Sequence, residues 1–370
     1  MNHEKHDPFL RISKRDSISH PKAWLIRLTA IFLALVVCAG IIYALSRSNP
    51  VQAYATMFKG AFGSTRKSWE TIRDAMLLLC ISVGLAPAFK MRFWNIGAEG
   101  QALVGGIVSA ACMIYWGNSI PTPLLLVIMF VVSFVAGAIW GLIPAFFKAR
   151  WNTNETLFTL MMNYLAIQLT SYCVTFWENP RNSNSVGLIN PSTKGGWFPA
   201  ILGNQYMLNV LIVLAITVAV FIYMRYTKHG YELSVVGESE RTAKYAGIKV
   251  ARVIMRTMAV SGAICGVAGF IAVAGASHTI STSTAGGRGF TAIIVAWLSK
   301  FNPFVMILFS FMLAFLEKGA MEIASQSNGV LNDYVSSMIT GILLFFILGS
   351  EFFVEYKVIF RHRAAKEVQD

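Results

Sequence analysis

The chain has 370 residues, of which 55% are hydrophobic and only 13% are charged, and the count of hydrophobic residues leaves out its 29 glycines. Soluble globular proteins carry about 45–50% apolar residues with glycine included and about 25% charged ones, so this composition excludes an ordinary soluble domain. The formal net charge of +13 could indicate nucleic-acid binding. The basic residues, however, fall mostly in short segments between apolar runs, a pattern typical of membrane proteins, and we expect no nucleic-acid partner.

The apolar residues occur in long unbroken runs rather than in alternation with polar residues. This pattern predicts helices and not a β-barrel. The first run, 28–45, follows a polar and basic leader. It is longer than a signal-peptide core of about 7–15 residues, and no small-residue cleavage site follows it, so we expect a retained anchor. The sequence therefore predicts an all-α polytopic membrane protein.

We expect about ten transmembrane helices, some of them short or broken. Three of the predicted spans fall below the roughly 17 residues that a crossing needs. Short helices at membrane depth are tolerated where they pack within protein or line a watery cavity, which predicts a pathway lined partly by these three; tilted helices with misplaced ends are the alternative. The predicted spans are 25–45, 75–89, 95–116, 122–147, 156–177, 207–224, 254–276, 289–299, 303–317 and 334–352, and the three short ones are 75–89, 289–299 and 303–317.

Ten crossings place both ends of the chain on one side of the membrane. Of the 31 Lys and Arg residues, 22 fall on that side and 9 on the other, which predicts that both termini are cytoplasmic. We expect a cytoplasmic tail over 1–23, a transmembrane domain over 24–356 and a second cytoplasmic tail over 357–370. Within the domain, a polar loop over 178–206 faces outward and a charged loop over 225–253 faces the cytoplasm.

Residues that would indicate an enzyme or a metal centre are scarce. The five cysteines all lie in apolar runs without a C-x-x-C pair, and the histidines show no metal-ligand spacing. No G-x-x-x-x-G-K-[ST] motif and no Ser-His-Asp arrangement occur. We therefore predict a non-catalytic chain that needs no metal or other cofactor.

The segment 92–101 opens a predicted span and yet contains Asn95, Glu99 and Gln101. An ionisable residue inside a membrane segment costs at least about 2.5–3.5 kcal/mol at the centre, so it usually faces a partner or water. One hypothesis is a polar break in the helix at a translocation pathway. The alternative is that Glu99 pairs with Arg92 or Lys90 near the cytoplasmic end.

Four segments in order resemble one family. Residues 93–101, FWNIGAEGQ, resemble the F-N-I-G-A-E-G-Q hallmark of permeases in nucleoside and simple-sugar ABC importers, with Trp94 as an insertion or an offset start. Residues 154–164 resemble the family's N-E-x-x-x-x-L-M-x-N-Y segment. Residues 230–238, 243–248 and 261–263 resemble its cytoplasmic loop and the following span, and 287–296 with 302–303 resemble its G-x-G-F-x-A-I-x-V-A…N-P stretch. The chain departs from the family at Ser234, where Arg is frequent, and at 297–299, where Leu-Leu-Gly is frequent.

The resemblance implies a division of labour in the bacterial cytoplasmic (inner) membrane. Two such permeases, alike or different, would pair with two cytoplasmic ATPase subunits and receive a nucleoside or related sugar from an extracytoplasmic binding protein, with the loop 178–206 as one docking surface. ATP hydrolysis would occur on the separate ATPase subunits. The candidates for the pathway are Asn95, Glu99, Gln101 and Asn163.

Residues 238–248 predict a short amphipathic helix that ends at a glycine and lays small residues into a groove on an ATPase subunit. A solvated connector is the alternative reading. The residues assigned to this coupling loop are Glu238, Ala243, Tyr245, Ala246 and Gly247.

Other transporters stay open as alternatives. A ribose or branched-chain amino-acid ABC permease is the nearest, because nothing in the sequence discriminates among these substrates. A secondary transporter would also show broken helices and a polar midplane, but it normally carries buried carboxylates in several spans, and here Glu99 alone qualifies clearly.

Overall fold

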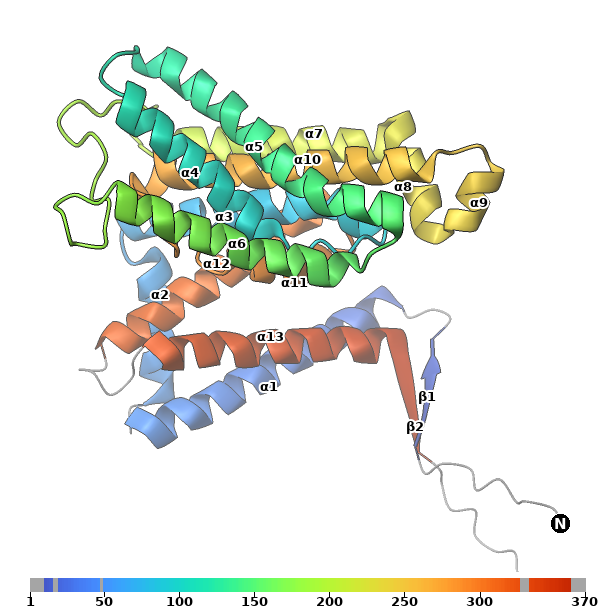
Figure 1. Cartoon of the computed structure of the whole chain (residues 1–370). Coiled ribbons are helices and arrows are strands. Elements are labelled where there is room, and N and C mark those ends of the chain that lie inside the picture. Colours follow the sequence, from blue (N-terminus) through green and yellow to red (C-terminus); the bar gives the residue numbers. More distant parts are fainter. Residues whose placement is uncertain (1–9, 16–18, 47–48, 327–332, 361–370) are drawn as a thin grey trace, which may run out of the picture. The chain divides into compact units, whose positions relative to one another are not determined.

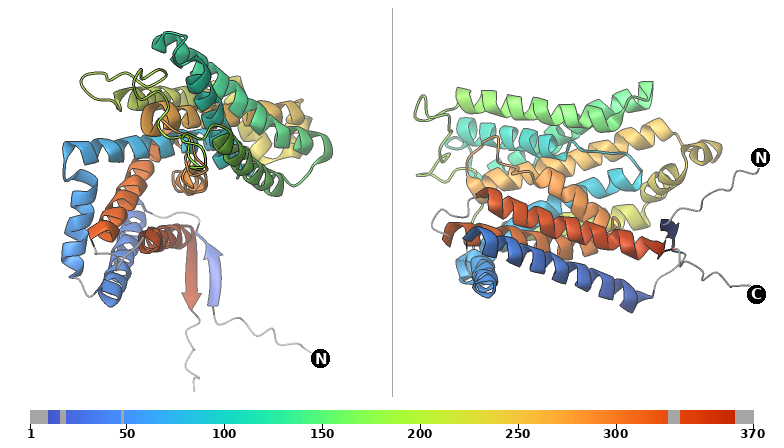
Figure 2. Two further views of the ribbon diagram at one scale, coloured as in Figure 1. Left: turned by 60° about the vertical axis from the view of Figure 1, so that its left-hand side comes forward. Right: turned by 90° about the horizontal axis from the view of Figure 1, so that it is seen from below.

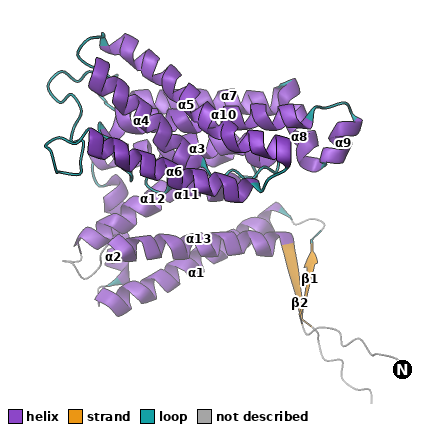
Figure 3. Cartoon of the chain, in the orientation of Figure 1, coloured by secondary structure: helices purple, strands orange, loops and turns teal. Residues whose placement is uncertain are grey.

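The computed structural model describes residues 10–15, 19–46, 49–326 and 333–360, and its regular structure is almost all helical (Figures 1 and 3). The chain divides into two compact units, Met1–Ala61 with Leu316–Asp370, and Phe62–Phe315. The elements are β1 Leu10–Lys14, α1 His20–Ser46, α2 Pro50–Phe62, α3 Thr65–Lys90, α4 Ala98–Trp116, α5 Thr122–Trp151, α6 Glu155–Phe176, α7 Met207–Tyr226, α8 Lys228–Glu238, α9 Glu240–Tyr245, α10 Val250–Ala272, the π-helical turn η1 Val273–Ser277, α11 Arg288–Leu298, α12 Pro303–Gln326, α13 Asp333–Glu355 and β2 Tyr356–Phe360.

Each of the ten predicted spans falls on a helix. Eight helices in the described residues are long and apolar enough to cross a membrane, α11 is a shorter apolar helix, and α13 covers the last predicted span. Two of the three short predictions were wrong: 75–89 is the second part of the 26-residue α3, and 303–317 belongs to the 24-residue α12. Charged residues near one end of each helix shorten its apolar run, so the predicted span covered only part of the helix. Only α11, with 11 residues, is short among the described spans.

The core of the unit Phe62–Phe315 is built around α10. This helix packs against α5, α4 and α3 (Figure 2). Of the 18 residues in its most apolar stretch, 89% are buried. Gly262, Gly266 and Gly269 share one face of α10, and a Cβ on Gly266 would lie 2.9 Å from Cα of Gly137 in α5. In lipid, small residues let helices approach closely enough for van der Waals contact to hold them together. The glycines of α10 therefore set the spacing of the core.

Other helices of this unit cover the core from outside. α6 packs on α4, and both α7 and α11 pack on α3. The outer faces of α5, α6 and α7 carry exposed apolar side chains such as Val127, Leu165 and Leu211. Such faces suit contact with lipid or with another membrane subunit.

In the other unit, α1 packs along α13, and the Arg27 Nε donates a 2.7 Å hydrogen bond to Glu351. β1 and β2 pair antiparallel, with Leu10 opposite Phe360 and Lys14 opposite Tyr356. This pair, which lies mostly in the two expected tails, was not predicted, because two five-residue segments from opposite ends of the chain carry no local turn signal. Residues 1–9, 16–18 and 361–370 of those tails lie outside the described residues.

Candidate functional site

The polar segment predicted to break a helix is indeed non-helical between α3 and α4, and Asn95 holds it in place. Asn95 is fully buried, and its side-chain oxygen accepts a 3.0 Å hydrogen bond from the amide of Gly97. Its Nδ2 donates to Gln101 and to Ser261 of α10, both at 3.2 Å. A buried backbone without helical hydrogen bonds needs such partners. Asn95 therefore fixes the break and joins it to the core helix.

Two residues of α6 bind the same segment from the other side. The Asn163 side-chain oxygen accepts a 2.8 Å hydrogen bond from the amide of Gly100, and its Nδ2 donates to the Ile96 carbonyl at 2.7 Å. The Thr159 hydroxyl accepts from the amide of Ile96 at 3.1 Å. The first turn of α4 is thus attached to α6 through side chains rather than through apolar packing alone.

Glu99 binds the start of the short helix α11. One carboxylate oxygen accepts from the amide of Gly287 at 2.8 Å, and the other accepts from the amide of Gly289 at 2.7 Å. A carboxylate that accepts two amides at a helix N-terminus is favoured by both the hydrogen bonds and the helix dipole. A Cβ on Gly289 would lie only 2.5 Å from the backbone nitrogen of Glu99, so this contact needs glycine.

A second buried carboxylate near α11 escaped the sequence analysis. Asp74 of α3 lies 2.8 Å from Arg73 and 3.6 Å from Arg288, the first residue of α11. The guanidinium of Arg73 also stands over the ring of Tyr206, 5.3 Å from its centroid. The predicted span began at position 75, just after Asp74, so this residue was read as part of a loop. Two carboxylates, one from α4 and one from α3, therefore hold the beginning of α11.

The four predicted pathway residues play related structural parts. Asn95, Glu99, Gln101 and Asn163 are each at most 5% exposed, and each is hydrogen-bonded within the chain. Glu99 bonds to α11 rather than to Lys90 or Arg92, so the alternative in which it pairs with one of these cations is wrong. The structure brings Asn95 and Gln101 together and places Glu99 and Asn163 on either side of the first turn of α4.

The predicted coupling helix, 238–248, is the short helix α9 with its C-terminal cap, and it follows directly on α8. Both helices lie at the end of the unit opposite to the loop 177–206 (Figure 1). α9 ends in a Schellman motif: the amide of Ile248 bonds to the Ala243 carbonyl at 2.9 Å, and that of Gly247 bonds to the Lys244 carbonyl at 3.1 Å. Gly247 has a φ of +76°, which glycine adopts without steric cost. The prediction that a glycine closes this helix is confirmed.

The side chains of this segment point in two directions. Ala243 is fully buried in a hydrophobic cluster with Leu233, Val236 and Met258, so it packs against its own chain and cannot touch a partner. Tyr245 is 94% exposed, and Glu238, Ala246 and Gly247 are also exposed. The surface available to another protein is therefore the face that carries Tyr245 and Ala246.

A charged pair attaches α8 to α10. The Arg256 Nη2 donates a 2.9 Å hydrogen bond to Glu232, and His229 lies 3.6 Å from the same carboxylate. The hydrogen bond from Arg256 lowers the pKa of Glu232 below its ordinary value. The pair therefore joins α8 to the core helix.

On the opposite end, the polar loop folds onto η1. The Trp197 ring stacks on His278 with centroids 3.8 Å apart and 4° between planes, and both line a cavity of about 340 Å³. The amide of Phe198 bonds to the Ala274 carbonyl at 3.0 Å. Burial lowers the pKa of His278 to about 4, which keeps the ring neutral near neutral pH. The loop is thus packed onto the helical unit.

A family model matches this architecture. The family described as "Branched-chain amino acid transport system / permease component" matches residues 69–348. This range contains eight of the ten predicted spans in full and most of the last, 334–352, but not the first, 25–45. The chain belongs to this permease family. The permease is therefore a membrane-spanning transport component, as the motifs in its sequence indicated.

Curated relatives extend over nearly the whole permease. It is 31% identical over 325 residues to the guanosine ABC transporter permease protein NupP of Bacillus subtilis, covering 87% of this chain and 92% of the relative. It is 28% identical over 352 residues to the glucose ABC transporter permease protein TsgB13 of Haloferax volcanii, covering 91% and 90%. The nucleoside ABC transporter permease protein NupB of Lactococcus lactis is 27% identical over 309 residues, covering 81% and 84%.

Two residues that depart from the family motifs meet in the permease. The rings of Trp94 and Trp297 stack with centroids 5.3 Å apart and 23° between planes. Phe89 and Phe301 pack against them. The pair joins the break before α4 to the far end of α11, so the two departures are parts of one contact.

Proposed function

We propose that this permease carries nucleosides or related simple sugars as the membrane-spanning subunit of an ATP-driven importer in the bacterial cytoplasmic membrane. The observation that carries the proposal is the near full-length similarity to permeases named for guanosine, nucleoside and glucose transport. The motif at 93–101 supports it, because its polar residues build the contacts around α4 and α11. Branched-chain amino acids are the second substrate class, favoured by the family's description.

The two ends of the unit Phe62–Phe315 suit two kinds of partner. We assign the end with α8 and α9 to cytoplasmic ATPase subunits, because Tyr245 and Ala246 are exposed on a short helix whose other face is buried in the core. We assign the loop 178–206 to the extracytoplasmic binding protein. A second permease, the same or different, would complete the pathway, and ATP hydrolysis would belong to the ATPase subunits.

Two features support the proposed orientation. The β1–β2 pair places residues 10–14 beside 356–360, which requires an even number of crossings between them. The excess of Lys and Arg on the side of the termini favours the cytoplasm for that side. We therefore propose ten crossings, with the transmembrane domain over 24–356 and both tails in the cytoplasm.

The pathway residues act, in this proposal, by holding α11. Asn95, Gln101 and Asn163 fix the break and the first turn of α4, and Glu99 extends from that turn to the amides of α11. α11 is too short to cross a bilayer of about 30 Å alone, since 11 residues span about 17 Å. A short helix fixed at its start by polar contacts suits the wall of a translocation pathway.

The test is uptake in the native host after deletion of the gene. Cells without the permease should lose uptake of a radiolabelled nucleoside, such as guanosine, and regain it with the gene on a plasmid. Labelled glucose, ribose and leucine are measured in parallel. Loss of leucine uptake alone would favour the second substrate class, and unchanged uptake of all four would contradict the proposal.

The energy source separates an ABC importer from a secondary transporter. Uptake by an ATP-driven system should stop when cellular ATP is depleted and persist when a protonophore collapses the ion gradient with ATP maintained. Purified permease should also retain an ATPase subunit through mild detergent extraction. The opposite pattern, loss with the protonophore alone, would indicate a secondary transporter.

A further inference from the structure

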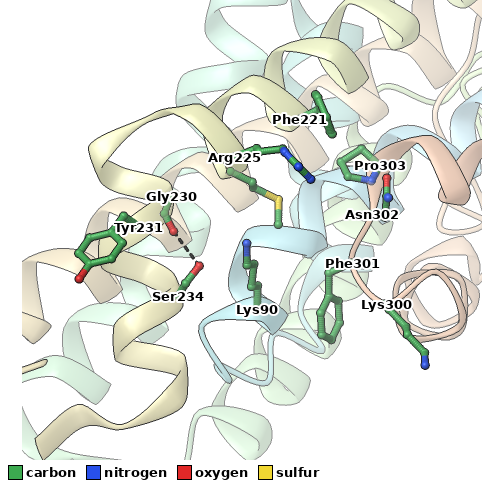
Figure 4. A pocket seen from close by; sticks show the side chains of 11 residues that line it. Lys90, Phe221, Arg225, Gly230, Tyr231, Ser234, Lys300, Phe301, Asn302 and Pro303 are labelled. Atoms are coloured by element: carbon green, nitrogen blue, oxygen red, sulfur yellow. Dashed lines mark hydrogen bonds between the residues drawn. The ribbon is translucent and has the colours of Figure 1, made fainter. Parts of the chain in front are cut away.

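A basic pocket of about 430 Å³ lies at the end of the unit Phe62–Phe315 where α8 is found (Figure 4). Three cationic residues line it, Lys90, Arg225 and Lys300, at or just after the ends of α3, α7 and α11. The Lys90 and Arg225 side chains point toward one another, whereas the Lys300 ammonium group at the edge of the pocket points away from them (Figure 4). Ser234 of α8 adds a hydroxyl group, which donates to the Gly230 carbonyl at 2.8 Å, whereas the Tyr231 ring points away from the cations (Figure 4). The apolar wall consists of Phe221, Met224, Phe301 and Pro303.

The positive charge of these three residues exceeds the partial negative charge of the helix C-termini around them. Each helix C-terminus carries about half a negative charge, so three of them offset about half of the three positive charges. The N-terminus of α12, which begins at Pro303 on the pocket, adds about half a positive charge. Within the described residues Lys90, Arg225 and Lys300 have no carboxylate partner. The pocket therefore keeps an excess of roughly two positive charges, which an anion would neutralise.

Lys300 occupies a left-handed backbone position that usually carries glycine. Lys300 and Phe301 have positive φ angles of 48° and 61°. The amide of Phe301 bonds to the Ala296 carbonyl and that of Lys300 bonds to the Trp297 carbonyl, both at 3.0 Å, which is the Schellman motif whose left-handed position glycine usually occupies. A lysine here is less stable than glycine but adds a charge to the pocket.

The apolar wall continues along the membrane-spanning helices. Phe221 of α7 packs edge-on against Phe304 of α12, with centroids 4.7 Å apart. Further along, Val218 and Ile222 of α7 and Leu308 of α12 are exposed. A pocket that is lined by cations and continues into the apolar surface of two helices matches an amphiphile with an anionic head.

We propose that the basic pocket binds the phosphate-bearing headgroup of an anionic phospholipid of the cytoplasmic leaflet, with the acyl chains along α7 and α12. Basic pockets between transmembrane helices on the cytoplasmic side attract such headgroups. The proposal rests on the cytoplasmic orientation proposed above. A lipid in this pocket contacts α8 through Gly230 and Ser234, next to the surface assigned to the ATPase.

The test is lipid retention by the purified chain. The permease is placed in nanodiscs or micelles with equal amounts of phosphatidylglycerol and phosphatidylcholine, and bound lipid is counted by native mass spectrometry. Lys90→Gln/Arg225→Gln/Lys300→Gln should lose the bound phosphatidylglycerol. The control changes the same number of exposed cations on the same side but outside the pocket, Arg150→Gln/Lys249→Gln/Arg252→Gln, and should retain it.

A single variant separates lipid binding from folding. Lys300→Gly removes one charge and relieves the positive φ, so its Tm should rise while phosphatidylglycerol binding weakens about fivefold, the contribution of one basic residue beside an anionic surface. Lys194→Gly is the matched control, because Lys194 also has a positive φ, of 53°, but lies in the polar loop. Its Tm should rise with lipid binding unchanged.

Three results would overturn the proposal. Equal phosphatidylglycerol retention by both triple variants would show that the pocket does not bind lipid. Displacement of the lipid by millimolar inorganic phosphate would assign the pocket to a free anion. Loss of the co-purified ATPase with lipid retention unchanged would assign it to an acidic segment of that partner. Because lipid counting needs no substrate, its failure would leave the proposed transport function unaffected, and failed transport would leave the lipid result standing.

Discussion

Glu99 and Gly289 lie 190 positions apart in the sequence, and the carboxylate of Glu99 accepts a 2.7 Å hydrogen bond from the amide of Gly289. The bond joins the first turn of α4 to the first turn of α11. Together with the bond from the amide of Gly287, it provides the N-terminal cap that α11 lacks from its own side chains, since Gly287 has none to offer. The start of α11 thus depends on a residue of another helix.

Glu99→Gln should destabilise the permease by about 1.5–3 kcal/mol, because hydrogen bonds to a charged group contribute that much and an amide can accept through only one of its two atoms. Uptake should fall by a larger fraction than the yield of folded protein, since α11 shifts while the core around α10 stays packed. Purified yield, Tm and uptake are measured on the same variant.

The control for this variant is Glu70→Gln. Glu70 forms a surface pair with Arg66, at 2.9 Å, whose loss should cost less than about 1 kcal/mol. If yield and uptake of Glu99→Gln fall in parallel, Glu99 serves folding alone.

Gly289→Ala tests the same contact from the other partner. The added Cβ would lie 2.5 Å from the backbone nitrogen and 2.8 Å from Cα of Glu99, so α11 must move away from α4. Overpacking of this kind typically costs about 1–3 kcal/mol. Gly341→Ala in α13 is the control, because nothing lies within 4 Å of its added Cβ, and alanine there should be neutral or stabilising. An unchanged Tm for Gly289→Ala would show that the two helices are not in the described contact.

The sequence correctly located the break within 92–101, because polar residues and glycines interrupt an apolar run there. It could not supply the partner of Glu99, since a single sequence carries no measure of distance between positions 99 and 289. The same limit hid the β1–β2 pair. Asp74 was missed for another reason: a charged residue near the end of α3 lowers the local hydropathy, and so the predicted span began after it.

Residues 238–248 show what a sequence pattern can and cannot predict for a short helix. The glycine at 247 correctly predicted a helix end. The sequence assigned Ala243 and Ala246 alike to the contact with an ATPase subunit, and this was wrong for Ala243, which packs against Leu233 and Met258 of its own chain. The two alanines could not be told apart, because α9 has only six residues, fewer than two turns, and a hydrophobic face is not defined over that length.

The attachment of α8 to α10 should depend on pH. The hydrogen bond from Arg256 lowers the pKa of Glu232 from its ordinary value of 4.5, so the stabilisation is fully present above that value and is lost as the pH falls through the lowered pKa. At neutral pH, Glu232→Gln should lower the free energy of unfolding by at most about 1 kcal/mol, because the pair is partly exposed.

The measurement is the Tm of both proteins across a pH series. The difference between wild type and Glu232→Gln should vanish in acid, once Glu232 is protonated in the folded state. Glu240→Gln, an exposed change on α9, should leave the Tm unchanged throughout. A constant difference between wild type and Glu232→Gln at all pH values would show that the charge of Glu232 is not responsible.

The last prediction concerns two alanines three positions apart. Ala246 is exposed beside Tyr245, whereas Ala243 is fully buried against Leu233. Ala246→Trp should fold normally and reduce the amount of co-purified ATPase roughly tenfold, the effect of about 1.4 kcal/mol of lost binding energy, with a parallel loss of uptake. Ala243→Trp should instead lower the yield of folded permease, because the indole has no room in the cluster.

Gly247→Val is a poorer probe than Ala246→Trp, because valine at a φ of +76° strains the end of α9 and mixes folding with docking. Binding of the extracytoplasmic partner should be unchanged in Ala246→Trp, since the loop 177–206 lies at the opposite end of the unit (Figure 1). Wild-type ATPase association and uptake in Ala246→Trp would show that α9 is a solvated connector. The coupling surface would then have to be sought elsewhere on the cytoplasmic side, because Ala243 is inaccessible to any partner.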